Sequence, residues 1–314
     1  MAAGLLILIK SADVLVEGAV AIAARLGLSA LVIGLTVVAF GTSMPELVVT
    51  LVAGSQGNPD LAIANVVGSN IANVLLVLGI AAMIRPLPVQ DQTVVSEIPF
   101  SLTAALLVGF LANAALFSDF PELSISRLDG GILLFFFLLF MLYVYKTSRN
   151  AGSAAADQVP EVLPGPGRTL IYVTGGIAGL YVGGELVVGG AVAFAEAVGI
   201  DDVVIGLTIV AIGTSTPELV ASSVAAYRGQ TDIAVGNVVG SNIFNLLWIL
   251  GITSTVVELP FSTITNTDLV MVILSSSLIL LSVVLSRTNT ILRSHGGVFV
   301  CCYLAYVVFV VLRT

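Results

Sequence analysis

Charged residues are scarce in this chain, which holds 11 Lys and Arg and 19 Asp and Glu among 314 residues. Charged residues make up 10% and hydrophobic residues 58%, whereas ordinary globular domains average about 25% and about 45–50%. A large soluble enzyme domain and a disordered charged arm are therefore excluded. The sequence also lacks a basic cluster, so we expect no nucleic-acid partner.

Cysteine and histidine are almost absent. Cys301 and Cys302 are adjacent within an apolar run, so they cannot crosslink distant parts of the chain. The single histidine, His295, stands beside Arg293 and is interpreted as a surface or interfacial residue rather than a proton relay. Without clustered His or Cys, a zinc or copper centre is disfavoured. We expect no cofactor.

Long apolar runs are what the chain has instead. A membrane helix needs about 20 apolar residues, and ten such runs follow one another. They predict an all-α membrane protein with ten transmembrane helices surrounded by membrane lipid. The predicted spans are residues 3–25, 28–55, 60–84, 98–118, 128–146, 169–197, 202–228, 232–256, 267–286 and 293–312.

The longest polar stretch, residues 147–168, predicts a linker between an N-terminal half (1–146) and a C-terminal half (169–314). Lys and Arg favour cytoplasmic loops. If the N-terminus is outside, eight of these residues fall in cytoplasmic connections and two fall outside. We therefore expect a multi-pass protein of the cell inner membrane, with a cytoplasmic linker and both termini outside the cytoplasm.

An internal repeat relates the two halves. Residues 34–79 align without a gap with residues 206–251, at a constant offset of 172, and 28 of the 46 positions are identical. Apolar composition alone would not repeat the polar strings GTSxPELV and NVVGSNIxN. Because each half holds five spans, an odd number, the second half must enter the membrane from the opposite side. The sequence thus predicts two inverted five-helix repeats, as in many secondary transporters.

One glutamate lies near the middle of a span in each repeat: Glu46 in the second span and Glu218 in the seventh. A charge at this depth costs about 2.5–3.5 kcal/mol on insertion scales, and no Lys or Arg stands within one helical turn. A mobile cation is the natural partner for such a carboxylate. The alternative is a protonated, hydrogen-bonded carboxyl with a structural role.

A glycine and a proline, four residues apart, interrupt both glutamate-bearing spans. Proline removes a helical N–H and disturbs the preceding turn, and carbonyls freed in a membrane need protein, water or ion partners. The residues concerned are Gly41 and Pro45 with the carbonyl of Ala39, and Gly213 and Pro217 with the carbonyl of Ala211.

Hydroxyl and amide side chains accompany the glutamates. Thr42 precedes Glu46 by four residues and can share its helix face, and Ser43 and Ser215 are predicted to cap the helices that follow them. The third and eighth spans carry polar stripes with a spacing of four, which can act either as ligands or as interhelical hydrogen-bonding groups. These stripes are Asn65, Ser69 and Asn73, and Asn237, Ser241 and Asn245.

The predicted ligands are therefore all oxygen atoms, which hard cations prefer. Calcium takes 6–8 oxygens in flexible geometry, whereas magnesium gives up its water reluctantly. Two carboxylates carry a charge of −2, which one Ca²⁺ or two Na⁺ would neutralise. A site that either ion can fill, but not both together, is the basis of antiport. The residues alone therefore indicate a transporter of alkali or alkaline-earth cations, but they do not identify the particular ions.

The doubled motif resembles the α-repeats of the cation/calcium exchanger superfamily, especially its compact prokaryotic sodium/calcium exchangers. The resemblance implies exchange of several Na⁺ for one Ca²⁺ by alternating access, with the first and sixth spans sliding past the rest. It implies that Glu46 and Glu218 bind both ions, and the expected metal ligands are these two with Thr42 and Thr214. The implied remaining ligands are Ser43, Ser215, Ser69, Ser241, Asn73 and Asn245.

Several alternatives stay open. In some relatives, including potassium-dependent ones, an Asp stands at the position of Asn245, so its amide argues against potassium co-transport. The same two glutamates would also serve a Ca²⁺/H⁺ exchanger. An intramembrane aspartyl protease is disfavoured because both central acids are Glu, and a passive channel is a further alternative. We expect neither an enzyme nor an obligatory protein partner, and we expect Lys10 to pair with Asp13.

Overall fold

The structure is a computed structural model that describes residues 2–114, 123–150, 163–197, 211–260, 263–286 and 288–313. Within them, seven helices are long and apolar enough to cross a membrane, or eight if one bent pair forms a single span. The predicted all-α, multi-pass membrane class is therefore confirmed. Residues 202–210 of the predicted seventh span and residues 151–162 of the predicted linker lie outside the described residues.

The first half of the chain forms helices in all five of its predicted spans. The fourth helix ends at Ala112, and residues 115–118 of the predicted fourth span lie outside the described residues. Its elements are α1 (Ala2–Leu26), α2 (Ala30–Ile33), the π-helix η1 (Gly34–Val38), α3 (Ala39–Thr42), α4 (Met44–Ser55), α5 (Pro59–Ala72), the π-helix η2 (Asn73–Leu78), α6 (Gly79–Ile84), β1 (Leu87–Pro88), α7 (Asp91–Val95), α8 (Glu97–Ala112), β2 (Ser124–Ile125) and α9 (Arg127–Asn150).

The second half repeats this order where it is described. Its elements are α10 (Pro166–Ala197), α12 (Ala211–Thr214), α13 (Thr216–Tyr227), α14 (Thr231–Ile243), the π-helix η6 (Phe244–Ile249), α15 (Leu250–Val256), β3 (Leu259–Pro260), α16 (Thr263–Leu285), β4 (Thr290–Ile291) and α17 (Arg293–Arg313).

The turns that follow the glutamate-bearing helices have the same geometry in both halves. Gly57 after α4 and Gly229 after α13 have φ of +76° and +80°, a conformation that favours glycine. They occupy equivalent positions, 172 residues apart. In the first half, the Asn58 side chain then accepts a hydrogen bond from the Leu61 N–H at 3.2 Å, and Pro59 opens α5.

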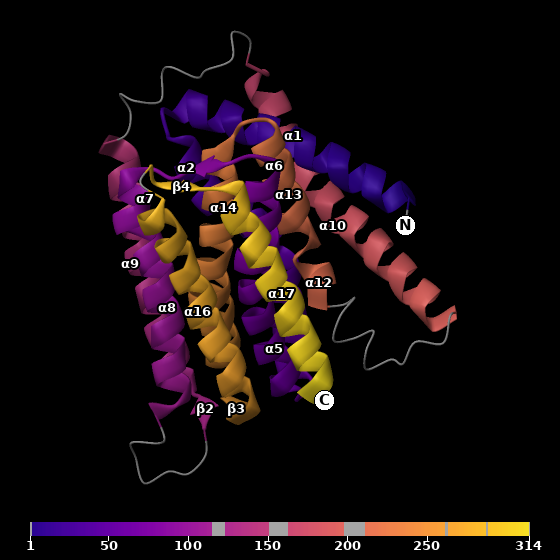
Figure 1. Ribbon diagram of the computed structural model, residues 1–314, viewed down its shortest axis with the longest axis vertical. Helices are drawn as coiled ribbons and strands as arrows, with labels where there is room; N and C mark the ends of the chain where they lie inside the picture. The colour runs from indigo at the N-terminus through magenta and orange to yellow at the C-terminus, as the bar shows by residue number, and fades with distance from the viewer. Residues whose placement is uncertain are drawn as a thin grey trace.

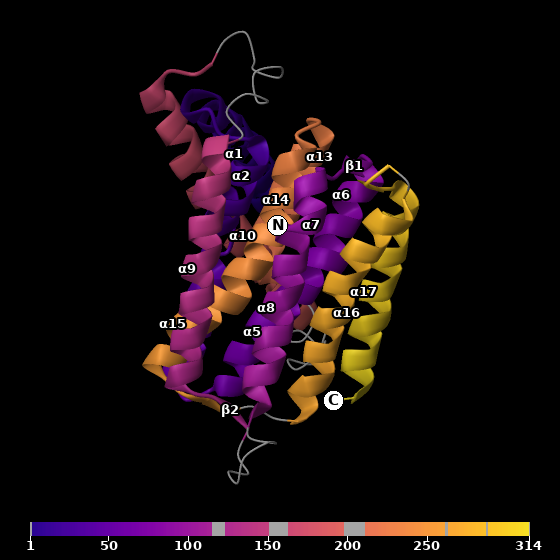
Figure 2. The same ribbon diagram turned by 90° about the vertical axis from the view of Figure 1, so that its left-hand side faces the viewer.

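The repeated motif builds the centre of the molecule. In the span from Thr231 to Val256, 94% of an 18-residue apolar stretch is buried inside the molecule. The corresponding share is 72% in the span from Pro59 to Ile84, but only 17% in α10 and 17% in α17. Figure 1 shows α1 and α10 side by side, crossing the remaining helices obliquely. Figure 2 shows α16 and α17 along one flank, with α8 next to α16.

Two short antiparallel ladders, which the sequence did not predict, join the halves. β1 pairs with β4 through Leu87 and Ile291, and β2 pairs with β3 through Ile125 and Leu259. Each ladder thus combines a strand of one half with a strand of the other. Figure 1 places β4 at one end of the helices and β2 and β3 at the opposite end, so the halves are linked at both ends.

The predicted pair of Lys10 and Asp13 is wrong. Asp13 forms an ion pair with Arg228, which caps the C-terminus of α13. Spacing along α1 places Lys10 and Asp13 within reach of each other, but it cannot show that another helix presents an arginine to Asp13. This contact ties α1 to the glutamate-bearing helix of the second half.

Candidate functional site

Both copies of the motif break their helix at a serine. Ser43 separates α3 from α4 with φ −84° and ψ 6°, and Ser215 separates α12 from α13 with φ −83° and ψ 5°. In the first half the two flanking segments are bent by 45°. The predicted interruption is therefore present in both repeats, with nearly the same backbone geometry.

The predicted capping role of Ser43 and Ser215 is wrong. Neither side chain makes a capping hydrogen bond to the helix that follows it. An N-cap residue usually has an extended backbone, whereas both serines have ψ near zero. The Ser43 hydroxyl instead donates to Glu218 Oε1 at 3.0 Å, so it crosses from the first repeat to the second.

Glu46 and Glu218 are completely buried, with 0% of their surface exposed. The Ser69 hydroxyl donates to Glu46 Oε1 at 3.5 Å, and the Ser241 hydroxyl donates to Glu218 Oε1 at 3.4 Å. These two contacts are equivalent in the repeat. Together with Ser43, they surround the carboxylates with hydroxyl groups.

Further contacts cross between the repeats at this depth. The hydroxyls of Ser69 and Thr214 lie 3.4 Å apart. The Asn242 amide donates to the backbone carbonyl of Asn70 at 3.4 Å, and these two asparagines are equivalent positions of the repeat. Because equivalent residues touch there, α5 and α14 cross where the two repeats meet.

Several buried polar atoms of the site have no hydrogen-bond partner among the described residues. They include one oxygen of each glutamate, Oε2, although both side chains are fully buried. A buried polar atom without a partner is costly, so each one calls for an explanation. Further ones at this depth are Ser215 Oγ, both polar side-chain atoms of Asn73 and of Asn245, and the Oδ1 atoms of Asn70 and Asn242.

Backbone groups contribute less than the sequence predicts. The carbonyl of Ala39 accepts the Ser43 N–H at 3.0 Å, so the helix break does not free it. It retains a second lone pair. Ala211 lies in the equivalent helix α12. Asn73 opens η2 and Asn245 lies in η6, and such π-helical turns, which we did not predict, are frequent at functional sites.

A second layer of polar contacts was only partly predicted. The Asn65 amide donates to Thr50 Oγ1 at 2.9 Å, and the Asn237 amide donates to Ser222 Oγ at 2.9 Å. Thr50 and Ser222 are equivalent positions that the sequence reasoning missed. Each stands one helical turn after its glutamate, and this spacing of four was the available signal.

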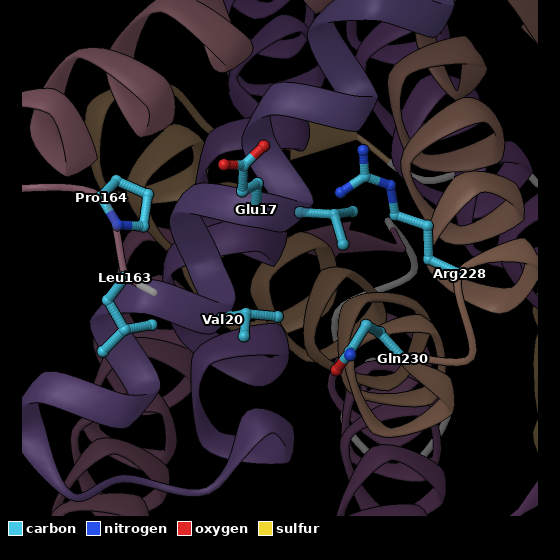
Figure 3. Close-up of a pocket in the computed structure, with 7 residues that line it drawn as sticks. Glu17, Val20, Leu163, Pro164, Arg228 and Gln230 are labelled. Atoms are coloured by element: carbon cyan, nitrogen blue, oxygen red, sulfur yellow. The ribbon is translucent and has the colours of Figure 1, made fainter. Parts of the chain in front are cut away.

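Two cavities border α13, one at the end that carries the helix break and the other at its C-terminal end. One of about 220 Å³ is lined by α4, α10 and α12–α13, including Pro45, Glu185 and Thr214. The other, of about 410 Å³, lies between α1, residues 163–164 and the turn after α13. Figure 3 shows Leu163 and Pro164 on one side of this second cavity and Arg228 and Gln230 on the other, with Glu17 of α1 between them.

Comparison with known proteins places the chain in a family. The model of the sodium/calcium exchanger protein family matches residues 1–146 and 168–312. CaxA from Alkalimonas amylolytica is 36% identical over 310 residues, which cover 96% of this chain and 95% of CaxA. The inner membrane protein YrbG from Escherichia coli is 38% identical over 256 residues, which cover 79% of this chain and 76% of YrbG.

A solved structure gives the same answer. The sodium-calcium exchanger NCX_Mj, soaked with Na⁺ and Ca²⁺, has a TM-score of 0.79 to this chain at 32% identity, over 97% of this chain and 95% of that one. The predicted resemblance is thereby confirmed. The family is one of ion transporters rather than enzymes. With two broken helices, two buried glutamates and a matching family model over both halves, this chain belongs to the sodium/calcium exchanger family.

Proposed function

We propose that this protein is a secondary active antiporter that exchanges Na⁺ for Ca²⁺ across the membrane by alternating access. One observation carries the proposal: two fully buried glutamates, one from each repeat, each keep a carboxylate oxygen without a partner among the described residues. No described lysine or arginine forms a salt bridge with either glutamate. A cation that binds between them would satisfy both charge and coordination.

The geometry supports a ligand set that both repeats supply. Ca²⁺ would bind Glu46 and Glu218 with the hydroxyls of Thr42 and Thr214, because it accepts many oxygen ligands in flexible geometry. Na⁺ would use the same carboxylates and the neighbouring oxygens. The remaining proposed ligands are Ser43, Ser215, Ser69, Ser241, the amides of Asn73 and Asn245, and the carbonyls of Ala39 and Ala211.

Coupling follows from charge. Two ionised glutamates carry a charge of −2, and an uncompensated charge is expensive in a low-dielectric interior. One Ca²⁺ or two Na⁺ neutralise the site, whereas both together would leave an excess of positive charge. Ca²⁺ and Na⁺ therefore compete, and each would load the site after the other has left. The central amides of Asn73 and Asn245 add no further charge, so we do not expect potassium co-transport.

For the architecture we propose ten spans arranged as two inverted five-helix repeats. The two ladders support this, since each joins the halves and they lie at opposite ends of the molecule (Figure 1). The contact between the equivalent residues Asn70 and Asn242 fits a two-fold axis between the repeats. In this architecture, the distribution of Lys and Arg supports an orientation with both termini outside the cytoplasm and residues 147–168 inside. The name of the relative YrbG supports an inner membrane location.

The proposal is tested in vesicles that contain the purified protein. Uptake of Ca²⁺ is measured after the vesicles are loaded with Na⁺ and diluted into Na⁺-free medium. We expect rapid uptake that stops when the Na⁺ gradient is removed and that saturates with Ca²⁺. Uptake that does not depend on the Na⁺ gradient would contradict Na⁺ coupling.

A Ca²⁺/H⁺ exchanger is the alternative, because buried carboxylates also bind protons. In the same vesicles, a pH gradient without Na⁺ separates the two functions. We expect it to drive little Ca²⁺ uptake, since the site is rich in hydroxyl ligands that suit Na⁺. Uptake driven by pH alone would favour the alternative and leave the two glutamates as the proton carriers.

A further inference from the structure

Asn237 is fully buried in α14, and both ends of its amide group have a partner. Its Nδ2 donates to Ser222 Oγ at 2.9 Å, and its Oδ1 accepts a hydrogen bond from Thr42 Oγ1 at 3.1 Å. All three side chains are at most 1% exposed. The three residues come from three helices and from both repeats, so this chain of hydrogen bonds connects the second repeat to the helix break of the first.

We propose that Asn237, held by Ser222, is a positioning residue that orients the Thr42 hydroxyl for cation binding. The inference rests on the proposed function, in which Thr42 is a cation ligand. A hydroxyl has one proton and two lone pairs. For its oxygen to face a cation, its proton must point elsewhere. Asn237 Oδ1 accepts that proton from the side of α14.

The helix itself offers the same proton two other acceptors, the carbonyls of Val38 at 3.1 Å and Ala39 at 3.3 Å. The requirement of Asn237 decides between them. If Thr42 turned its proton to the helix, Asn237 Oδ1 would be left unsatisfied in a fully buried place, which costs more than a single hydrogen bond contributes. Ser222 prevents the amide from rotating to escape this, because Nδ2 is already engaged.

The same amide also sets the register between α13 and α14. Asn237 stands one turn before Ser241, and Ser222 stands one turn after Glu218. The hydrogen bond of Asn237 with Ser222 is therefore a second one between α13 and α14, one helical turn away from that of Ser241 with Glu218 at 3.4 Å. A hydrogen bond one turn away holds the glutamate and its hydroxyl partner at the same level.

The equivalent amide in the first repeat has different contacts. Asn65 donates to Thr50 Oγ1 at 2.9 Å and also to the Glu46 backbone carbonyl at 3.2 Å, and it is only partly buried. Both of these hydrogen bonds stay within the first repeat, whereas Asn237 reaches across to the other repeat. Asn65 therefore provides a matched control, since it has the same side chain at the equivalent position of the repeat and no hydrogen bond with Thr42 in the described structure.

The test is a double-mutant cycle on the full-length protein in vesicles and in detergent. Asn237→Leu keeps the volume and removes the acceptor. We expect it to raise the apparent KM for Ca²⁺ about 3- to 10-fold with little change in the maximal rate, since a net hydrogen bond contributes roughly 0.5–1.5 kcal/mol. Thr42→Val should have a similar effect. The double variant should be no worse than either single one.

Two comparisons make the result specific. Asn237→Asp retains an acceptor for Thr42 and should restore the apparent KM to within about threefold of the unsubstituted protein. In the control cycle, Asn65→Leu combined with Thr42→Val should show additive losses, because no hydrogen bond joins these two residues in the described structure. Additive losses for Asn237→Leu and Thr42→Val would overturn the inference, and so would an Asn237→Asp variant as impaired as Asn237→Leu.

A second readout separates this inference from the proposed function. The rise in unfolding temperature on adding Ca²⁺ or Na⁺ reports cation binding whichever ion is coupled to transport. Absence of Na⁺-driven Ca²⁺ uptake by the unsubstituted protein would reject the proposed exchange alone. In that case, the double-mutant cycle of Asn237 and Thr42 is evaluated from the shift in unfolding temperature that the cations cause. The unfolding temperature without cations shows whether Asn237→Leu folds. If it does not fold, the two single variants Asn237→Asp and Ser222→Ala are compared instead.

Discussion

Arg228 at the C-terminal cap of α13 forms an ion pair with Asp13 of α1, and the repeat has no counterpart for it. The residue equivalent to Asp13 is Glu185, which lines the cavity beside Pro45. The residue equivalent to Arg228 is Gln56, the C-cap of α4, which has no charge. The two halves thus differ: Arg228 after α13 has an ionic contact with α1, whereas the equivalent residues Gln56 and Glu185 form no ion pair in the described structure.

In the proposed orientation, this contact holds α1 against the core on the cytoplasmic side, next to the cavity in Figure 3. Asp13→Asn or Arg228→Gln should therefore favour opening toward the cytoplasm. Both side chains are partly exposed, at 40% and 33%, and exposed pairs contribute about 0.2–1 kcal/mol. We expect the ratio of apparent Ca²⁺ affinities at the two faces to change about 1.4- to 5-fold. Flux in right-side-out and inside-out vesicles measures this ratio.

The reversed pair is the control for this prediction. Asp13→Arg combined with Arg228→Asp exchanges the charges and should bring the ratio back toward that of the unsubstituted protein. Neutralising Glu185 alone should not imitate the loss of Asp13, because no ion pair of Glu185 is present in the described structure. An unchanged ratio in both single variants would show that the pair does not bias the two states.

Replacing either central glutamate should separate transport from folding. Glu46→Gln and Glu218→Gln each remove half of the charge that would neutralise Ca²⁺. We expect transport to fall by about two to four orders of magnitude, since the loss of one partner from a buried charge pair costs roughly 3–5 kcal/mol. Without cations, both variants should be at least as stable as the unsubstituted protein, because a buried charge without a counter-ion is removed. Flux and unfolding temperature measure the two effects.

Glu97 supplies the matched control for the glutamate variants. It is also buried, at 2% exposure, and Tyr143 donates a hydrogen bond to its Oε1 at 2.8 Å. It lies at the start of α8, outside the repeated motif in the sequence. Glu97→Gln keeps an acceptor for Tyr143 and should leave transport within about twofold, in line with the loss of no more than a few tenths of a kcal/mol. An equal loss of transport in all three variants would contradict a specific role of Glu46 and Glu218 in cation binding.

The sequence indicated which residues share a depth in the membrane, but it did not indicate which ones touch. The doubled motif predicted Glu46, Glu218 and their hydroxyl neighbours, because a repeat at constant offset places equivalent residues at equivalent levels. The contact of Ser43 with Glu218 could not be predicted in this way. It depends on how the two repeats approach each other, and helical periodicity defines only the face of a single helix.

Local rules failed where tertiary contacts decided the outcome. Ser43 has the composition of an N-cap, yet its hydroxyl contacts a buried carboxylate of the other repeat. Asp13 has a lysine three residues away, yet it pairs with an arginine from another helix. The distant partner of Ser43 is a carboxylate, which is a strong hydrogen-bond acceptor, and the distant partner of Asp13 is an arginine of opposite charge. The π-helical turns and the ladders were also not predictable, because they depend on contacts between the halves.

Asp268 and Arg313 form a second ion pair, between the first turns of α16 and the end of α17, at 2.6 Å. Tyr306 also donates to Asp268 at 2.9 Å. Arg313→Gln would leave a mostly buried carboxylate without its cation and should destabilise the protein by about 2–3 kcal/mol, less than a fully buried pair because Arg313 is 23% exposed. The double variant Asp268→Asn with Arg313→Gln should recover at least half of that loss. Unfolding in detergent measures the cycle, and additive losses would contradict the coupling.

Gly240 of α14 permits the close approach of the segment that carries Thr42. A Cβ atom at this position would lie 2.6 Å from the Leu35 carbonyl oxygen and 2.8 Å from the Ala39 Cβ. Backbone atoms cannot move aside as a flexible side chain can, so Gly240→Ala must push α14 away from η1 and α3. We expect a loss of about 1–3 kcal/mol in stability, as for other overpacked interiors.

The same displacement would lengthen the hydrogen bond between Thr42 and Asn237, so Gly240→Ala should also raise the apparent KM for Ca²⁺. Gly175 on α10 is the control, because a Cβ there would meet no described atom within 4 Å. Gly175→Ala should leave transport unchanged and stabilise the helix by up to about 1 kcal/mol. Unfolding temperature and Ca²⁺ flux are measured for both variants. A Gly240→Ala protein with the stability and KM of the Gly175→Ala protein would show that the close packing of α14 against η1 is not required.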